Sequence, residues 1–307
     1  MNQFFLPFSI PLSTSKINHS NAFTFLGSCF SDEIGTVAEL SGFDTLINPF
    51  GTIFNPISIG DQLLKSTIKS QEVAILEREN RYYSWEASTK IAANSPEEIK
   101  KLILQKREGL ALQLSKPGFL IVTFGTAFLY RLNQGEVVAN CHKQPGHFFQ
   151  KELVSKEEIL NLWKQVISNL QEWNPSLKII FTVSPVRHVR DGIVENNRSK
   201  ARLIDAVAEL VNNPQVMYFP SYEIVLDVLR DYRFFKKDRV HPNEEAIQYV
   251  WDSFSSVYFS DETKSIVQQI MQIRKRLAHK SDQIMSLDEK TLQVLNGFKQ
   301  NYPWIRW

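Results

Sequence analysis

A serine that follows a short apolar run is the first group in this sequence whose position suggests chemistry. Residues 23–27 are typical of a buried strand, and the residues after Ser28 favour the start of a helix. This order predicts a strand-to-helix turn with the Ser28 hydroxyl over the first helical turn. Unpaired backbone N–H groups and the positive end of the helix dipole favour negative charge there. Ser28 is therefore a candidate nucleophile whose oxyanion the turn would stabilise.

Two other interpretations of this stretch stay open. Ser31 is a good N-cap with Asp32 and Glu33 in the first helical turn, so the stretch could be purely structural. Gly27 would then serve only a tight turn. Cys29 offers a thiol nucleophile instead, although its side chain points away from that of Ser28 and free cysteine is usually buried. We favour Ser28 over Cys29.

The second chemical signal is the Asp238-Arg-Val-His241 sequence near the other end of the chain. An aspartate three residues before a histidine can bring its carboxylate to Nδ1 and leave Nε2 free. The carboxylate would fix the tautomer and stabilise the imidazolium. The same spacing is common at surface helix starts, which Asp238 or Asn243 could cap. Combined with Ser28, it predicts a Ser-His-Asp triad.

Composition places the chain among ordinary globular proteins and removes several functional classes. The 307 residues are 43% hydrophobic and 22% charged, with a net charge of +2, which gives no general case for nucleic-acid or membrane binding. No signal peptide or membrane-spanning run is evident, and the two cysteines form no disulfide framework, so we expect a cytoplasmic protein. Glycine-rich phosphate loops are lacking. Cys141, His142 and His147 are too few for a convincing metal site, so no cofactor or metal is expected.

Strands alternate with helices through the middle of the chain, which predicts a three-layer α/β/α sandwich with a mainly parallel central sheet. Ser28, Gly125, Ser184 and the loop before Asp238 would then lie at one sheet edge. Residues 43–54 are expected to form a loop, and hairpins are expected over 73–85 and 128–139. The expected strands are 23–27, 118–125, 177–183 and 216–219, and the expected helices are 31–41, 56–69, 95–114, 155–172, 197–211, 222–229, 244–259 and 262–278.

The Gly27-Ser28-Cys29-Phe30 sequence after a first strand resembles the signature of the GSCFA family, which belongs with the SGNH (GDSL-like) hydrolases and the related PC-esterases. The resemblance covers most of residues 20–260, including 140–143 and 184–188. It implies an SGNH hydrolase-like, flavodoxin-like domain over 21–260, after a lead-in over 1–20 and before extra helices over 261–307. It also implies Ser28 as nucleophile, His241 as general base and acid, and Asp238 as the orienting carboxylate.

One block departs from the SGNH pattern. The G-x-N-D block, whose Asn donates to the oxyanion, appears here as Gly125-Thr126-Ala127. The oxyanion hole would then use the Ser28 and Gly51 N–H groups with the Thr126 hydroxyl or Asn48. Losing one such donor costs on the order of a hundredfold in turnover.

The resemblance and the loop positions together give a set of expected substrate-binding residues. Histidines in polar loops are more often structural, but strand ends are where ligands bind. Arg187 could hold an anionic or sugar-hydroxyl group. The expected substrate-binding residues are Asn48, Gly125, Asn140, His142, Arg187 and His188.

The expected activity is that of a serine esterase that removes a short acyl group, such as acetyl, from a carbohydrate or other small ester through an acyl-enzyme. An acyltransferase with the same triad and a non-catalytic glycan-binding domain stay open as alternatives. The expected partner is the small-molecule or carbohydrate ester. The sequence does not indicate an oligomeric state.

Overall fold

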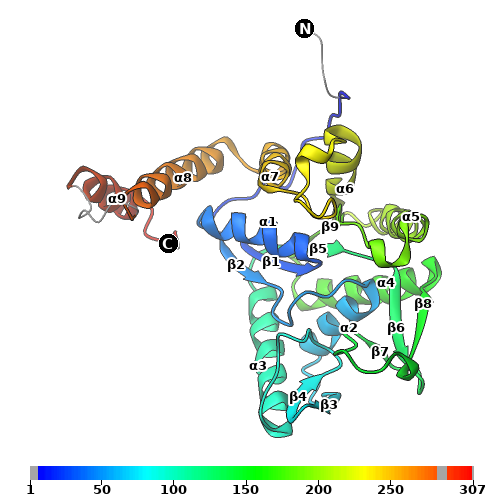
Figure 1. Ribbon diagram of the computed structural model, residues 1–307. Coiled ribbons are helices and arrows are strands. Elements are labelled where there is room, and N and C mark those ends of the chain that lie inside the picture. The colour runs from blue at the N-terminus through cyan, green and yellow to red at the C-terminus, as the bar shows by residue number, and fades with distance from the viewer. Residues whose placement is uncertain (1–5, 282–288, 306–307) are drawn as a thin grey trace.

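A five-stranded parallel sheet forms the centre of the protein, in a computed structural model that describes residues 6–281 and 289–305 (Figure 1). Counted from the β2 edge, its strands run in the order β2-β1-β5-β9-β10. Numbered along the chain this order is 2-1-3-4-5, the flavodoxin-like arrangement. This confirms the expected fold class. The strands are β1 (Ala22–Gly27), β2 (Asp44–Ile47), β5 (Gly118–Phe124), β9 (Lys178–Val183) and β10 (Val216–Tyr218).

Strand β2 was not expected, because residues 43–54 were predicted to form a loop. It lies at the sheet edge and pairs with β1 from Ala22↔Asp44 to Phe25↔Ile47. Its four residues are only half-buried. Such a short strand carries too little hydrophobic pattern to be recognised, because its partner strand rather than its own sequence defines it.

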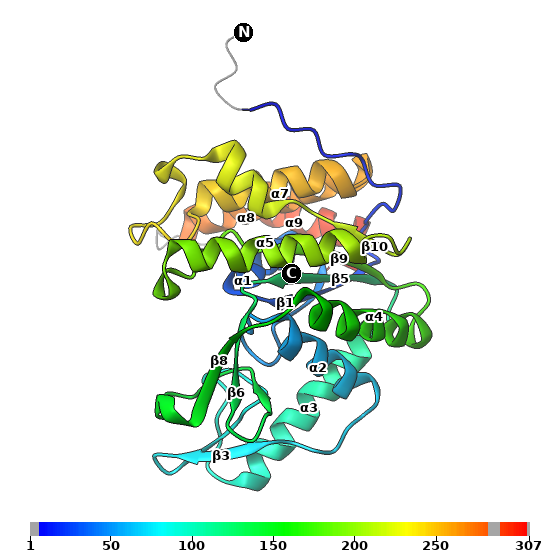
Figure 2. The same ribbon diagram turned by 90° about the vertical axis from the view of Figure 1, so that its right-hand side faces the viewer.

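Helices cover both faces of the sheet. Phe23 and Phe25 of β1 point into the core under α1 (Cys29–Leu40) and α7 (Glu244–Tyr258), whereas Leu26 points into the opposite core. Figure 2 shows α7 on one side of the sheet, with α4 and α2 on the other. The second core is formed by α2 (Pro56–Thr67), α3 (Pro96–Leu114), α4 (Lys156–Trp173) and α5 (Ile193–Leu210).

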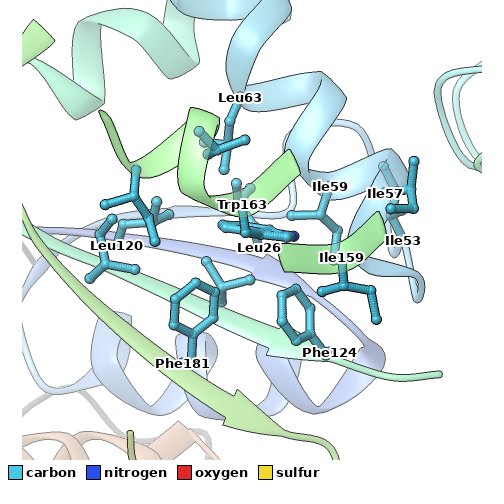
Figure 3. Close-up of a cluster of buried hydrophobic side chains, with 14 of the residues drawn as sticks. Leu26, Ile53, Ile57, Ile59, Leu63, Leu120, Phe124, Ile159, Trp163 and Phe181 are labelled. Carbon is cyan, nitrogen blue, oxygen red and sulfur yellow. The ribbon is translucent and has the colours of Figure 1, made fainter. Parts of the chain in front are cut away.

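The second core is built around a fully buried tryptophan (Figure 3). The Trp163 ring lies edge-on to Phe124 of β5 and Phe181 of β9, with ring centroids 5.1 and 4.9 Å apart. Its indole N–H donates to Pro56 O at 3.1 Å, so the buried polar atom is satisfied. This packing ties α4 to α2 and to the strands that end at the candidate site.

Two small antiparallel units extend from the main sheet, as expected. One pairs β3 (Ile75–Arg78) with β4 (Arg81–Ser84). The other pairs β6 (Phe128–Leu132) with β7 (Val137–Val138) and also with β8 (Phe149–Leu153), a strand that was not expected. Figure 1 shows both units on the side of α2 and α3.

Most helix starts agree with the capping residues in the sequence. The Asn55, Ser95, Ser155 and Asn243 side chains each accept from a backbone N–H of the first turn. Short helical segments connect the later elements: η1 (Gly146–Phe148), η2 (Val189–Asp191), α6 (Ser221–Glu223), the π-helical η3 (Ile224–Leu229) and η4 (Tyr232–Phe234).

The last two helices form a core of their own. Ile266, Ile270 and Ile273 of α8 (Asp261–Ser281) cluster with Phe298 of α9 (Glu289–Asn301) and with Ile305. These helices extend beyond α7 in Figure 1. Within the described residues, no helix is long and apolar enough to cross a membrane.

Candidate active site

The turn that leaves β1 is fixed by close backbone contact with β5. Gly27 has φ +133°, and a Cβ there would lie 2.1 Å from Thr123 O, so only glycine fits. The Ser28 N–H donates to the same oxygen at 3.1 Å. Helix α1 begins at Cys29, and Ser28 is its N-cap, with the hydroxyl accepting from the Phe30 N–H at 3.3 Å. The helix therefore starts earlier than expected, and Ser31 is not its cap.

Asn48, in the loop after β2, braces this turn from the side. Its amide oxygen accepts from the Gly27 N–H at 2.8 Å, and its amide nitrogen donates to Asp32 at 2.6 Å. Thr52 donates to the other Asp32 oxygen at 3.1 Å. Asn48 is buried and has φ +38°, a conformation that asparagine tolerates better than most residues. These contacts give Asn48 a structural role at the turn.

The Asp238–His241 pair has the geometry that the sequence predicts. His241 Nδ1 lies 2.7 Å from one Asp238 carboxylate oxygen. The other oxygen accepts from the backbone N–H groups of Val240 at 2.9 Å and His241 at 3.0 Å. These backbone donors, and then the imidazole, hold the pKa of Asp238 well below its usual range. The carboxylate stays ionised and fixes the ring, so His241 Nε2 is available for proton transfer.

Arg187, in the loop after β9, supports the loop that carries this pair. Its guanidinium lies 4.6 Å from the Phe235 ring centroid and donates to Arg239 O at 3.2 Å. A cation over an aromatic face is worth about 0.5–1 kcal/mol at a partly exposed site. Arg187 thus connects the β9 loop with the residues between Asp238 and His241.

A cavity of about 610 Å³ opens at this edge of the sheet. Its lining includes Val240 and His241 and also Cys29 at the start of α1. The loop after β2 and the β6–β8 unit contribute Thr52, Phe54, Asn55, Thr126, Phe128, Tyr130, Asn140 and Cys141, and the loop after β9 contributes Arg187, His188 and Asp191. The site thus lies at the switch point between β1 and β5, where ligands bind in open α/β sheets.

Residues 22–254 match the model of the GSCFA family. The chain belongs to the GSCFA family. The matched segment contains β1, the α1 turn and the Asp238–His241 loop, and it ends within α7. The helices α8 and α9 lie beyond the match.

Comparisons with solved structures give distant similarities only. A carbohydrate esterase family 3 protein from Talaromyces cellulolyticus aligns over 54% of this chain and 66% of its own, at 13% identity and a TM-score of 0.29. An acetyl xylan esterase from the rumen bacterium Butyrivibrio proteoclasticus aligns over 78% of this chain and 63% of its own, at 12% identity and a TM-score of 0.41. The chain thus spans less than two thirds of either protein's length. No curated protein matches it.

The predicted site residues of this GSCFA domain divide into two groups. Thr126, Asn140, Arg187, His188 and His241 line the cavity. The cavity-lining residues do not include Ser28, Asn48, Gly51, Gly125, His142 or Asp238. Asp238 acts on the cavity through His241. Ser28, the nucleophile that the sequence predicts, is buried, and the adjacent Cys29 lines the cavity.

Two of the predicted oxyanion donors are already used inside the protein. The Ser28 N–H is held by Thr123 O, and the Gly51 N–H donates to Asn48 O at 2.7 Å. The Thr126 hydroxyl is 3.0 Å from the Ser199 hydroxyl and accepts from the Phe128 N–H. By contrast, the backbone N–H of Thr52, which lines the cavity, has no hydrogen-bond partner among the residues described, and the backbone N–H of Cys29 hydrogen-bonds to its own sulfur.

His142 occupies a structural position in the GSCFA domain. It is fully buried, its Nε2 lies 2.8 Å from Ser84 O, and its ring packs against Tyr83 and Trp85. Burial lowers its pKa, so the ring is neutral at neutral pH. Across 6–281 and 289–305, no group of three His, Cys, Asp or Glu residues could hold a metal ion.

A buried cation lies behind the cavity. Lys200 is fully buried, and its ammonium donates to Gly125 O at 2.5 Å and to Ser184 O at 2.6 Å, which ties the ends of β5 and β9 together. Burial lowers the pKa of Lys200 to about 7. Burial and the Lys200 charge lower the pKa of His188 to about 4, so His188 is neutral at neutral pH.

Proposed function

We propose that this GSCFA domain is an SGNH-type acyl hydrolase that removes a short acyl group, such as acetyl, from a carbohydrate or other small ester. The observation that carries this proposal is the Asp238-oriented imidazole of His241 on a cavity that also receives the N-terminus of α1. A base with a fixed tautomer beside a helix N-terminus is the arrangement that acyl transfer needs.

In this reaction His241 takes a proton from a nucleophile in the Ser28–Cys29 turn, and that nucleophile attacks the ester carbonyl. The imidazolium, stabilised by Asp238, then gives its proton to the leaving alcohol. Water hydrolyses the acyl-enzyme with His241 again as base. Ser28 is the nucleophile that the sequence predicts.

The cavity lining supports a sugar ester as the substrate class. The aromatic side chains of Phe54, Phe128 and Tyr130 offer flat apolar surface for a ring, and Asn140 and Arg187 offer hydrogen bonds.

The test is turnover of p-nitrophenyl acetate and of acetylated xylose by the purified full chain. We expect His241→Ala to lower kcat/KM by about a thousandfold or more. Asp238→Asn should lower it about ten- to a hundredfold, less than for a buried triad aspartate because Asp238 is 48% exposed. His147→Ala is the matched control, because His147 is exposed and does not line the cavity.

Two results would contradict the proposal. Turnover that His241→Ala leaves unchanged would remove the site from the reaction. Binding of acetylated sugars without turnover would instead favour the glycan-binding alternative. Acetyl transfer to an added sugar in preference to water would show an acyltransferase.

A further inference from the structure

We propose that the attacking atom of this site is the Cys29 sulfur, and that the Ser28 hydroxyl is a structural helix cap. This inference rests on the proposed function and concerns the identity of its nucleophile. It makes the acyl-enzyme a thioester rather than an oxygen ester.

The first observation is the position of Ser28. Only 1% of its surface is exposed, and the cavity-lining residues do not include it. Its hydroxyl accepts from the Phe30 N–H, its N–H donates to Thr123 O, and its backbone is extended at φ −69° and ψ 171°. An N-cap serine of this kind has its oxygen turned back onto the helix backbone. Attack on a substrate would require it to leave the cap.

The second observation is the position of Cys29. It is the first residue of α1, it is half-buried, and it lines the cavity together with His241. Its backbone N–H hydrogen-bonds to its own sulfur and to no other described residue. The Thr52 N–H, joined by the Cys29 N–H once the sulfur has turned to the substrate, can therefore donate to the oxyanion, the task for which Ser28 and Gly51 have no free N–H. A thiol at a helix N-terminus also gains from the helix dipole as it ionises.

The third observation is the charge around the sulfur. Burial, then Asp32 and more weakly Glu33, raise the pKa of the Cys29 thiol, whereas the hydrogen bond from its own backbone N–H and the buried Lys200 lower it. Asp32 is held by Asn48 and Thr52, and Glu33 pairs with Lys236 at 2.8 Å. The resting group is consequently the neutral thiol, so the reaction needs a base, a role that we assign to the His241 imidazole on the same cavity.

The steps balance with this one base. His241 Nε2 takes the thiol proton as Sγ bonds to the carbonyl carbon, and the carbonyl π electrons become the oxyanion. The oxyanion collapses and breaks the C–O bond, and the leaving alkoxide takes the proton from His241. Water then attacks the thioester, His241 takes a water proton, and the departing sulfur recovers that proton.

Three variants of the full chain separate the two nucleophiles. We expect Cys29→Ala to lower kcat by about a thousandfold or more. Ser28→Ala should stay within about tenfold of the wild type in kcat while losing about 1 kcal/mol of unfolding free energy with the cap. Cys29→Ser, made together with Cys141→Ala because Cys141 also lines the cavity, should retain weak turnover that iodoacetamide no longer inhibits. Abolished turnover in Ser28→Ala with full turnover in Cys29→Ala would overturn the inference.

A measurement on the folded chain does not depend on how Ser28 and Cys29 variants fold. Cys141→Ala leaves Cys29 as the only cysteine. We expect iodoacetamide to remove its turnover in proportion to the alkylation of Cys29, seen by intact mass. Acid-quenched acyl-enzyme should release its acetyl group to neutral hydroxylamine, as thioesters do. Complete alkylation with turnover unchanged would refute the cysteine.

The two failures can be told apart. If His241→Ala abolishes turnover but alkylation of Cys29 does not, only the identity of the nucleophile is wrong. If His241→Ala leaves turnover intact, the proposed function itself fails.

Discussion

Replacing Asn48 tests how the nucleophile turn is held, because this one side chain connects the end of β1, the loop after β2 and helix α1. In Asn48→Ala the buried Gly27 N–H loses its acceptor, which costs about 1–3 kcal/mol. The Asp32 carboxylate loses the hydrogen bond from Asn48 but keeps the one from Thr52, which costs about 1 kcal/mol. Alanine at φ +38° adds about 1 kcal/mol of backbone strain. We therefore expect a loss of about 3–5 kcal/mol in unfolding free energy.

Two further variants separate these contributions. Asn48→Gly removes the same hydrogen bonds without the strain, so it should be about 1 kcal/mol more stable than Asn48→Ala. Asn48→Asp keeps an acceptor for Gly27 but places a second carboxylate against Asp32. The unfolding free energy of this variant should come closer to that of the wild type as pH falls to values at which carboxylates are protonated, because a proton on either acid removes the repulsion.

Equilibrium urea unfolding followed by circular dichroism measures these differences, with the slope checked for each variant. Tyr130→Ala, an exposed residue on the cavity rim, is a control for general sensitivity of this edge. An Asn48→Ala variant within about 0.5 kcal/mol of the wild type would show that the contacts around Gly27 and Asp32 do not stabilise the turn.

Three further predictions concern the same edge of the sheet. The pKa of His188 is about 4 in the folded protein against 6.5 ordinarily, so between these values the unfolded chain binds one proton more than the folded chain. As pH falls from 6.5 to 4, the unfolding free energy should therefore decrease by up to about 3 kcal/mol. In the same urea series, the unfolding free energy of His188→Gln should decrease less over this pH range. Gly27→Ala should fail to fold or lose more than about 3 kcal/mol of unfolding free energy, because the new Cβ would collide with Thr123 O. Soluble yield and thermal melting measure this loss, and a variant as stable as the wild type would contradict the prediction. Arg187→Ala should lower kcat on p-nitrophenyl acetate about tenfold with little change in KM, because this substrate has no sugar for Arg187 to bind. Arg187→Lys should not restore kcat, since a lysine keeps the charge but not the planar contact with Phe235. A change confined to KM on this substrate would show that Arg187 does not position the loop of Asp238 and His241.

The layered architecture could be predicted because its signals are local and repeated. The strand 118–125 is apolar except for Thr123, and 177–183 is apolar except for Lys178 and Thr182. The serine caps at 95 and 155 predict the helices that follow them. Strand β2 and strand β8 depend on partners far away in sequence. Neither carries a pattern strong enough to outweigh a loop interpretation.

Individual side chains at the site were harder to predict, because their surroundings come from distant segments. His142 stands in a polar stretch, yet the hairpins bring Tyr83 and Trp85 around it and bury it completely. Asn48 looked like a ligand-binding residue, yet both ends of its amide are used by the turn. Polarity in the sequence does not distinguish a group that faces a ligand from one that satisfies buried backbone.

The start of α1 shows why a single residue matters at such a site. Ser28 and Ser31 are both good caps, so the sequence alone leaves the first helical residue uncertain by a turn. Successive helical residues point about 100° apart, so moving the start changes which side chain faces the cavity. With Ser28 as cap, its oxygen is directed at the Phe30 N–H and the next side chain, Cys29, lies on the cavity wall. The close approach of Gly27 to Thr123 fixes where the helix can begin, and the start of the helix in turn determines that Cys29 rather than Ser28 lines the cavity.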